Sequence, residues 1–153
     1  MKAAVVRQHG TVELMDIADP VPGPYDCLVE IDACATCTGT DLSLIHGTFP
    51  WLKDTPYIVG HESTGIIVEV GEKVANFRVG QRVTRPAGIL PGHPVDGIGS
   101  MWGGFAEKGL VRDTEKEKAE GKESDFMHML ACVPLADDVD AASAAYSLSL
   151  IHI

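Results

Sequence analysis

The stretch that decides the fold lies at positions 56–71 and reads Pro56-Tyr57-Ile58-Val59-Gly60-His61-Glu62-Ser63-Thr64-Gly65-Ile66-Ile67-Val68-Glu69-Val70-Gly71. Its second half, positions 65–71, is rich in β-branched residues and begins and ends with glycine, which predicts a strand. Just before that strand a histidine and a glutamate stand side by side at positions 61 and 62. Imidazole nitrogen and carboxylate oxygen are both zinc ligands in proteins.

Short β segments separated by turn signals fill most of the chain. We expect further strands at 2–7, 11–17, 26–33, 79–83, 104–112 and 130–135. The Pro- and Gly-rich positions 19–24 form a loop that helices and central strands cannot enter. Many short strands with such turns predict a mainly β fold, either a barrel or a partly open sandwich.

Three segments do not follow this pattern. Positions 86–104 are rich in Gly and Pro without periodicity, which predicts a long loop. The charge run at 113–125 could form a short exposed helix, with Lys116 and Glu120 at i,i+4 spacing, but a solvated surface insertion is favoured. An Ala-rich helix is expected to begin at Ala141, after a cluster of acids.

Length and charge restrict the function. The chain has 153 residues, enough for one domain, and a net charge of −10, which disfavours nucleic acid and anionic membranes as partners. The sequence contains no run of about 18 apolar residues, so no membrane span is predicted. The apolar part of the N-terminus is too short for a signal peptide. Cytoplasmic residence is therefore expected. The cysteines, Cys27, Cys34, Cys37 and Cys132, lack the spacing of a disulfide scaffold.

A second cluster supplies complementary chemistry and reads Cys34-Ala35-Thr36-Cys37-Thr38-Gly39-Thr40-Asp41-Leu42. A cysteine here and His61 are candidate zinc ligands, provided that the fold brings the two elements together. Asp41 is a candidate for the carboxylate that orients a zinc-bound imidazole, and Thr40 for a hydroxyl that passes a proton from a bound alcohol.

Each of these residues also has a simpler interpretation. Cys34 and Cys37 form a C-x-x-C that could be half of a structural zinc site or a redox pair, although no second C-x-x-C exists. Cys34 alone favours a packed core thiol, His61 alone a structural histidine, and Glu62 alone a side chain that faces solvent. Only their combination favours a metal centre.

That combination resembles the zinc-containing medium-chain dehydrogenases. The matching motifs, in the family's order, are Gly39-Thr40-Asp41, Pro56 with Gly60-His61-Glu62, positions 65–71, Gly80-Gln81-Arg82-Val83, Gly103-Gly104-Phe105-Ala106-Glu107 and Leu135-Ala136-Asp137-Asp138-Val139. The resemblance covers positions 1 to about 145. It implies a GroES-like partly open β-barrel with short helices over 1–147. A nucleotide-binding Rossmann domain, missing here, is expected to follow this barrel.

The resemblance also implies roles for individual residues. Cys37 and His61 would bind the catalytic zinc, and Glu62 would be the neighbouring carboxylate that can approach or ligate it. Asp41 would hold the His61 ring, and Thr40 would contact the substrate hydroxyl. The implied activity is zinc-assisted hydride transfer between an alcohol or polyol and NAD or NADP. The full-length enzyme is expected to be a homo-oligomer, and this fragment alone is expected to be inactive.

The chain departs from the family pattern in several places. Thr38 separates Cys37 from Gly39-Thr40-Asp41, so either the loop is one residue longer or Thr38 takes the ligand position; Cys37 is favoured because a thiolate binds zinc far better. Ser43 stands where some members have a proton-relaying histidine. The family's third ligand, a Cys or Glu, is expected at or beyond the end of this chain. Loop 86–104 lacks the four cysteines of a structural zinc lobe, so at most one zinc is expected.

The last six residues, Leu148-Ser149-Leu150-Ile151-His152-Ile153, resemble the in-frame translation of a transposase adaptor used in sequencing libraries. We therefore expect 148–153 to be a non-native tail. Two other functions stay open: a zinc-free enone or quinone reductase of the same superfamily, and a co-chaperonin-like binding module without enzymatic activity.

Overall fold

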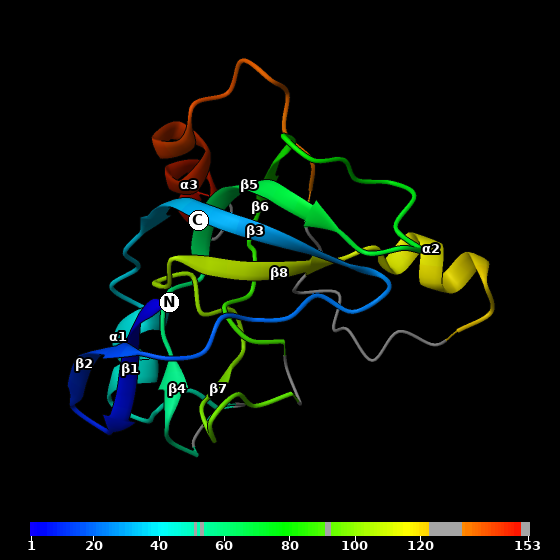
Figure 1. Ribbon diagram of the computed structural model, residues 1–153. Coiled ribbons are helices and arrows are strands. Elements are labelled where there is room, and N and C mark those ends of the chain that lie inside the picture. The colour runs from blue at the N-terminus through cyan, green and yellow to red at the C-terminus, as the bar shows by residue number, and fades with distance from the viewer. Residues whose placement is uncertain (51, 53, 91–92, 123–132, 151–153) are drawn as a thin grey trace.

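The computed structural model describes residues 1–50, 52, 54–90, 93–122 and 133–150 (Figure 1). Most of the strand expected at 130–135, the end of the charge run, Cys132 and positions 151–153 lie outside the described residues. The elements are β1 (Lys2–Gln8), β2 (Thr11–Asp16), β3 (Asp26–Ala35), α1 (Thr40–Ile45), β4 (Tyr57–Ile58), β5 (Glu62–Val70), β6 (Arg82–Thr84), β7 (Gly99–Ser100), β8 (Lys108–Arg112), α2 (Thr114–Ala119) and α3 (Ala141–Leu150).

The strands form two four-stranded sheets, with the orders β2-β1-β4-β7 and β6-β5-β3-β8. All pairs are antiparallel except β4 with β7. Segment 104–107 joins the sheets, because Phe105 O accepts from Ala4 N of β1 while Glu107 O accepts from Ile31 N of β3. The sheets do not close into a full barrel. A mainly β, partly open fold with short helices was predicted and is confirmed.

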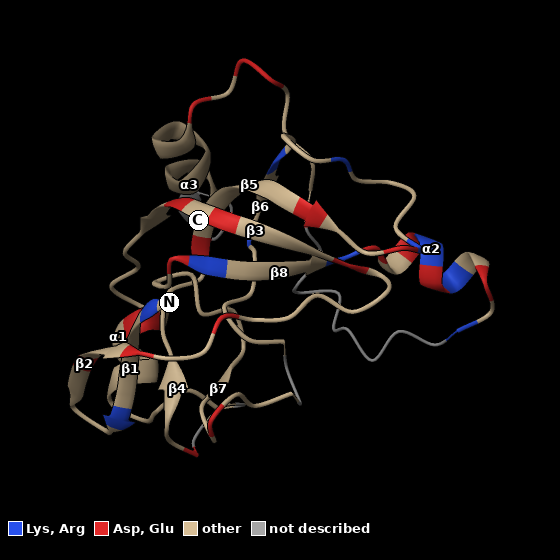
Figure 2. Cartoon of the chain, in the orientation of Figure 1, with Lys and Arg blue, Asp and Glu red and all other residues tan. Residues whose placement is uncertain are grey.

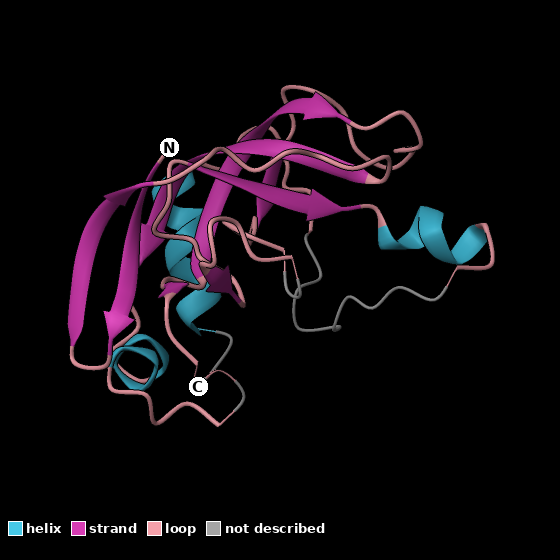
Figure 3. Cartoon of the chain, turned by 60° about the horizontal axis from the view of Figure 1, so that its bottom comes forward, coloured by secondary structure: helices cyan, strands magenta, loops and turns pink. Residues whose placement is uncertain are grey.

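The helices lie at the margins of the strands. Figure 3 shows α2 projecting from one end of the molecule, whereas α3 packs on β3 and β5. Helix α3 continues through Leu148, whose side chain is buried, to Leu150. The expected boundary at 147 therefore falls inside a helix, and the origin of residues 148–153 stays a prediction. Among the described residues, no helix has the length and apolarity needed to cross a bilayer.

Several strand limits differ from those expected. The strand expected at 79–83 begins only at Arg82, because Gly80 adopts a φ of 82° in a turn. The strand expected to begin at Gly65 begins at Glu62, and β3 extends to Ala35, because these strand ends pair with each other. Both extensions lie beside the candidate metal ligands. Hydrophobic periodicity could not reveal them, since polar and small residues occupy the added positions.

The loop expected at 86–104 is held at several points in its described part. It contains β7, which pairs with β4, and a bridge joins Ala87 to Leu110 of β8. Its apolar side chains are buried, namely Ile89, Leu90, Ile98, Met101 and Trp102. The long loop expected here is confirmed for most of its described positions, with β7 as a short strand within it. This segment contacts residues distant in the sequence, so local sequence patterns could not predict these contacts.

The charge run begins with a buried anchor. Asp113 is 1% exposed and caps α2, accepting the backbone N–H of Lys116 at 3.0 Å. It also accepts the backbone N–H groups of Ala75 and Asn76 at 2.8 and 2.9 Å and the Asn76 side-chain amide at 2.8 Å. The helical alternative is thus correct for 114–119, and the favoured solvated insertion is wrong there. Charges of both signs alternate on α2 (Figure 2), and Lys116 pairs with Glu120 at 3.2 Å.

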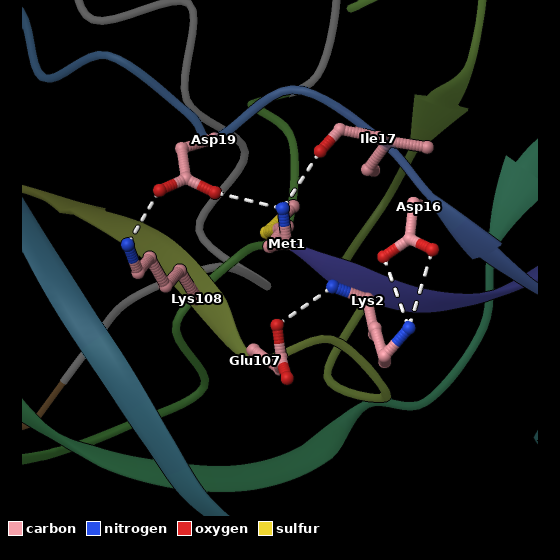
Figure 4. Close-up of polar contacts among 7 residues, drawn as sticks. All are labelled: Met1, Lys2, Asp16, Ile17, Asp19, Glu107 and Lys108. Carbon is pink, nitrogen blue, oxygen red and sulfur yellow. Dashed lines mark hydrogen bonds and ion pairs between the residues drawn. The ribbon is translucent and has the colours of Figure 1, made fainter.

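Polar contacts also hold β1 against segment 107–108 (Figure 4). The Lys2 backbone N–H donates to the Glu107 carboxylate at 2.7 Å, and Asp19 lies between Lys108 and the Met1 ammonium. Hydrogen bonds from Lys108 and the Met1 ammonium lower the pKa of Asp19 to about 2. These exposed pairs join the two sheets on the side where segment 104–107 crosses.

Candidate metal centre

Sheet register brings the two sequence clusters together. In the β3–β5 ladder, Ala35 pairs with Glu62 and Cys34 pairs with Ser63. Cys37 lies two residues beyond the end of β3, and His61 lies one residue before the start of β5. An antiparallel pair places the end of one strand beside the start of its partner. Residues 24 positions apart in the sequence (37 and 61) therefore meet at one edge of this sheet.

The convergent side chains are Cys37, His61 and Glu62. One potential ligand atom from each, the thiol sulfur, an imidazole nitrogen and a carboxylate oxygen, lies within 4.8 Å of the others. Cys37 is partly exposed, His61 is 2% exposed and Glu62 is fully buried. A soft sulfur, an imidazole nitrogen and a carboxylate oxygen form a donor set that suits zinc.

Asp41 connects the two ligand-bearing segments. Its Oδ1 lies 2.9 Å from His61 Nδ1, and its Oδ2 accepts the backbone N–H of Cys37 at 2.9 Å. The carboxylate is buried because Asp41 is in the first turn of α1, a helix that sequence analysis did not predict. This contact leaves Nε2 as the imidazole nitrogen that points to the other candidate ligands, at 3.6 Å from Glu62 Oε1.

Glycine at position 60 is required by both conformation and space. Its φ is 93°, in the left-handed region that side chains with a Cβ rarely adopt. A Cβ there would lie 2.6 Å from the backbone nitrogen of Phe105. The turn at Gly60 directs the chain from β4 into β5 and places His61 and Glu62 in the interior. The simpler interpretation of Glu62, a side chain that faces solvent, is therefore wrong.

The surroundings of Glu62 test whether a metal ion fits. Neither of its carboxylate oxygens receives a hydrogen bond from the described part of the chain, although both are buried. A buried carboxylate without hydrogen bonds costs several kcal/mol unless a cation neutralises it. A divalent cation bound by Cys37, His61 and Glu62 would supply that charge. The residues present therefore fit a zinc ion.

Cys34 differs from Cys37 in its environment. It pairs with Ser63 near the end of β3 and is half-buried, with its sulfur 3.0 Å from the position a Cβ on Gly104 would take. Burial, followed by the negative charges of Asp41 and Glu62, raises the pKa of the Cys34 thiol to about 12. The thiol form persists at neutral pH, in keeping with the packed core cysteine suggested by the sequence.

The remaining predicted positions lie close by. Thr40 is half-buried and begins α1, directly before Asp41, whereas Thr38 is exposed. Sequence analysis missed Trp102, whose indole centroid lies 5.3 Å from that of the His61 ring. Only the tryptophan itself in a Gly-rich segment could have hinted at this contact, because the segment reaches His61 through tertiary pairing.

Comparisons with known proteins identify the family of this chain. The profile described as the alcohol dehydrogenase GroES-like domain matches residues 23–118, a range that includes Cys37, Asp41, His61 and Glu62. An alcohol dehydrogenase of Cupriavidus necator is 40% identical over 109 residues, which cover 69% of this chain and 29% of that protein. The chain spans only 24–36% of the length of the curated relatives it matches.

Solved structures show the same fold. A zinc-binding dehydrogenase from Sinorhizobium meliloti bound to NADP superposes with a TM-score of 0.68 at 29% identity, covering 95% of this chain and 41% of that one. Quinone oxidoreductase from Escherichia coli complexed with NADPH also gives a TM-score of 0.68, at 18% identity, covering 96% of this chain and 37% of that one. This second likeness concerns the fold alone. The GroES-like fold expected from the sequence is thus confirmed.

Proposed function

We propose that residues 1–147 form the zinc-binding catalytic part of an enzyme acting on alcohols or polyols. The chain belongs to the alcohol dehydrogenases that share a GroES-like domain, and this family supports the proposal. Cys37, His61 and Glu62 would hold the zinc ion. The observation that carries this proposal is their convergence within 4.8 Å, together with the buried Glu62 carboxylate that accepts no hydrogen bond from the described residues.

Bound zinc would supply Lewis-acid polarisation of a substrate oxygen, which favours loss of the hydroxyl proton. The protein's own residues arrange the rest. Asp41 keeps the His61 ring in one tautomer and orientation by accepting from Nδ1, and holds the Cys37 backbone with its other oxygen. We assign Thr40 the contact with the substrate hydroxyl. Thr40 is the first residue of α1, directly before Asp41, and its side chain carries a hydroxyl that can relay a proton.

Hydride acceptance by NAD or NADP belongs to the part of the relatives that this chain does not match. The relatives are about three to four times longer than the matched portion. Binding of the dinucleotide, oligomerisation and catalytic turnover are therefore proposed for the longer protein. The test of the metal centre can begin with this chain, because Cys37, His61 and Glu62 all lie within it.

The decisive experiment compares Cys37→Ser with Cys34→Ser, two thiol-to-hydroxyl changes three positions apart. Each purified chain is titrated with zinc against a chromophoric chelator. We expect one zinc per wild-type chain, a loss of affinity on the order of 100-fold in Cys37→Ser, and little change in Cys34→Ser. Circular dichroism checks that both variants are folded.

The same titration separates the alternatives left open by the sequence. Wild-type chain that binds no zinc would favour the zinc-free reductase or the binding module over a zinc enzyme. Equal loss of zinc in Cys34→Ser and Cys37→Ser would assign the metal to a C-x-x-C site instead. In the longer protein, alcohol oxidation that disappears with Cys37→Ser and is kept in Cys34→Ser would support the dehydrogenase.

A further inference from the structure

Trp102 lies against the candidate ligand His61. The two ring centroids are 5.3 Å apart and the planes are inclined by 45°, which is van der Waals contact between the rings. Trp102 is 5% exposed, so water has little access to the indole. Phe49 also meets the indole in an edge-type arrangement, with centroids 6.0 Å apart and planes at 70°. The imidazole thus has an aromatic wall, the Trp102 indole, beside it, and a second aromatic ring contacts that indole.

Backbone hydrogen bonds fix this wall relative to His61. Gly104 N donates to Gly60 O at 2.8 Å, and Phe105 N donates to Val59 O at 3.0 Å. The segment that carries Trp102 is therefore bonded to the residues that immediately precede His61. A further bond, from Gly88 N to Trp102 O at 2.7 Å, holds the tryptophan backbone itself. The contact between the rings follows from this pairing, so the indole does not need to reorganise when a metal binds.

We propose that Trp102 is a positioning residue for the metal centre, which restrains the His61 imidazole by packing beside it while Asp41 restrains it at Nδ1. This inference rests on the proposed function, since it assumes that His61 binds zinc. Asp41 holds one atom of the ring but leaves the ring free to tilt about that hydrogen bond. Packing against a fixed indole removes this freedom, which lowers the entropy lost when the imidazole coordinates a metal.

The electrostatics act in the same direction. A metal-bound imidazole carries more positive charge than a neutral one, and the π-electrons of an indole whose centroid is 5.3 Å away can stabilise that charge. Trp102 also excludes water from one side of His61, so the interaction is not screened as it would be in solution. Removal of the indole should therefore weaken metal binding while the ligand atoms remain.

The test uses fluorescence in a chain whose single tryptophan is Trp102. The chain has two tryptophans, so Trp51→Phe leaves only the indole beside His61. Zinc is titrated into this variant with emission as the readout. We expect a change in emission intensity that saturates at one equivalent of zinc. The change should be absent in the double variant that carries both Trp51→Phe and Cys37→Ser. A tryptophan that served only the core would not respond to zinc.

A second measurement gives the energetic effect. Zinc affinity is measured by chelator competition for Trp102→Phe and Trp102→Leu, with Phe77→Leu as the control, since Phe77 packs on the cluster around Cys27 and Val29. We expect affinity to fall by a few fold in Trp102→Phe and on the order of tenfold in Trp102→Leu, the lower end for groups that support metal ligands. Phe77→Leu should bind zinc like wild type.

The outcomes separate this inference from the proposed function. Wild type that binds no zinc contradicts the proposed function and this inference with it. Wild type that binds one zinc, with unchanged affinity in both Trp102 variants or no emission response in Trp51→Phe, overturns the role of Trp102 alone. Were Trp102→Leu to unfold, Trp102→Phe and the fluorescence titration would decide.

Discussion

Glu62 and Asp113 are both buried carboxylates, but their surroundings are opposite. Asp113, at the start of α2, accepts hydrogen bonds from Ala75, Asn76 and Lys116 through both of its oxygens. Glu62, at the start of β5, accepts none from the described residues, and its Oε1 lies 3.6 Å from His61 Nε2. The described fold supplies hydrogen bonds to Asp113, whereas the Glu62 carboxylate is placed to receive a cation.

The difference distinguishes a structural carboxylate from a functional one. Hydrogen bonds to a charged oxygen each stabilise the folded state, and four of them make the burial of Asp113 favourable. An unsatisfied buried charge does the reverse, and proteins keep such groups chiefly where they bind or react. Substitution at the two positions should therefore change stability in opposite directions.

The largest expected effect is that of Asp113→Ala. Removal of the carboxylate leaves the backbone donors of residues 75, 76 and 116 without their acceptor and removes the cap of α2. We expect the free energy of unfolding to fall by about 3–5 kcal/mol, as for loss of a buried hydrogen-bonded charge. Urea denaturation followed by circular dichroism measures it.

The matched control is Asp140→Ala, which removes another helix cap, since Asp140 Oδ1 accepts from Ser143 N at 3.0 Å on the surface. This loss should be clearly smaller. Equal losses in the two variants would show that Asp113 acts as an ordinary cap and that its additional hydrogen bonds contribute nothing.

The second prediction concerns Glu62→Gln, which keeps the shape and removes the charge. In excess chelator we expect this variant to be more stable than wild type by about 1–2 kcal/mol, because no buried charge remains to be compensated. Added zinc should then stabilise wild type far more than Glu62→Gln, through preferential binding to the folded state. Denaturation midpoints with and without zinc provide both values.

Asp113→Asn serves as the comparison for Glu62→Gln, since it makes the same change of carboxylate to amide. It should lose stability whether or not zinc is present. A Glu62→Gln chain that is destabilised in chelator would mean that the Glu62 carboxylate has compensation within the protein, and the contrast between the two sites would fail.

The smallest effect is the pH dependence that comes from Asp113. Burial alone would raise the pKa of this carboxyl, but hydrogen bonds from Asn76, Ala75 and Lys116 hold it below the ordinary value of 3.8. Because the pKa is lower in the folded state than in the unfolded state, the contribution is complete above 3.8 and is lost as pH falls through the folded pKa.

The stability difference between wild type and Asp113→Asn measures this dependence. It should stay constant from about pH 5 to 8 and shrink only below the ordinary carboxyl range. A difference that already declines near pH 6 would indicate that the pKa of Asp113 is raised.

The sequence predicted the fold class because alternation and turn residues are local properties. The strands over 2–7, 11–17 and 26–33 follow directly from such patterns and agree with β1, β2 and β3. The errors came where long-range pairing decides. Gly99–Ser100 became a strand only because it pairs with β4, and Asp113 became a buried cap only because residues 75 and 76 reach it.

For the candidate site, the sequence by itself determined which donor atoms the chain can offer. Tertiary structure decided that the Ala35–Glu62 register brings Cys37 to His61, that Glu62 is buried, that Gly60 takes a left-handed conformation, and that Trp102 lies beside the imidazole. The physical reason is the separation in sequence of the residues that set each property. Ligand chemistry is a property of single residues, whereas proximity and burial arise only when strands distant in sequence pair and exclude water.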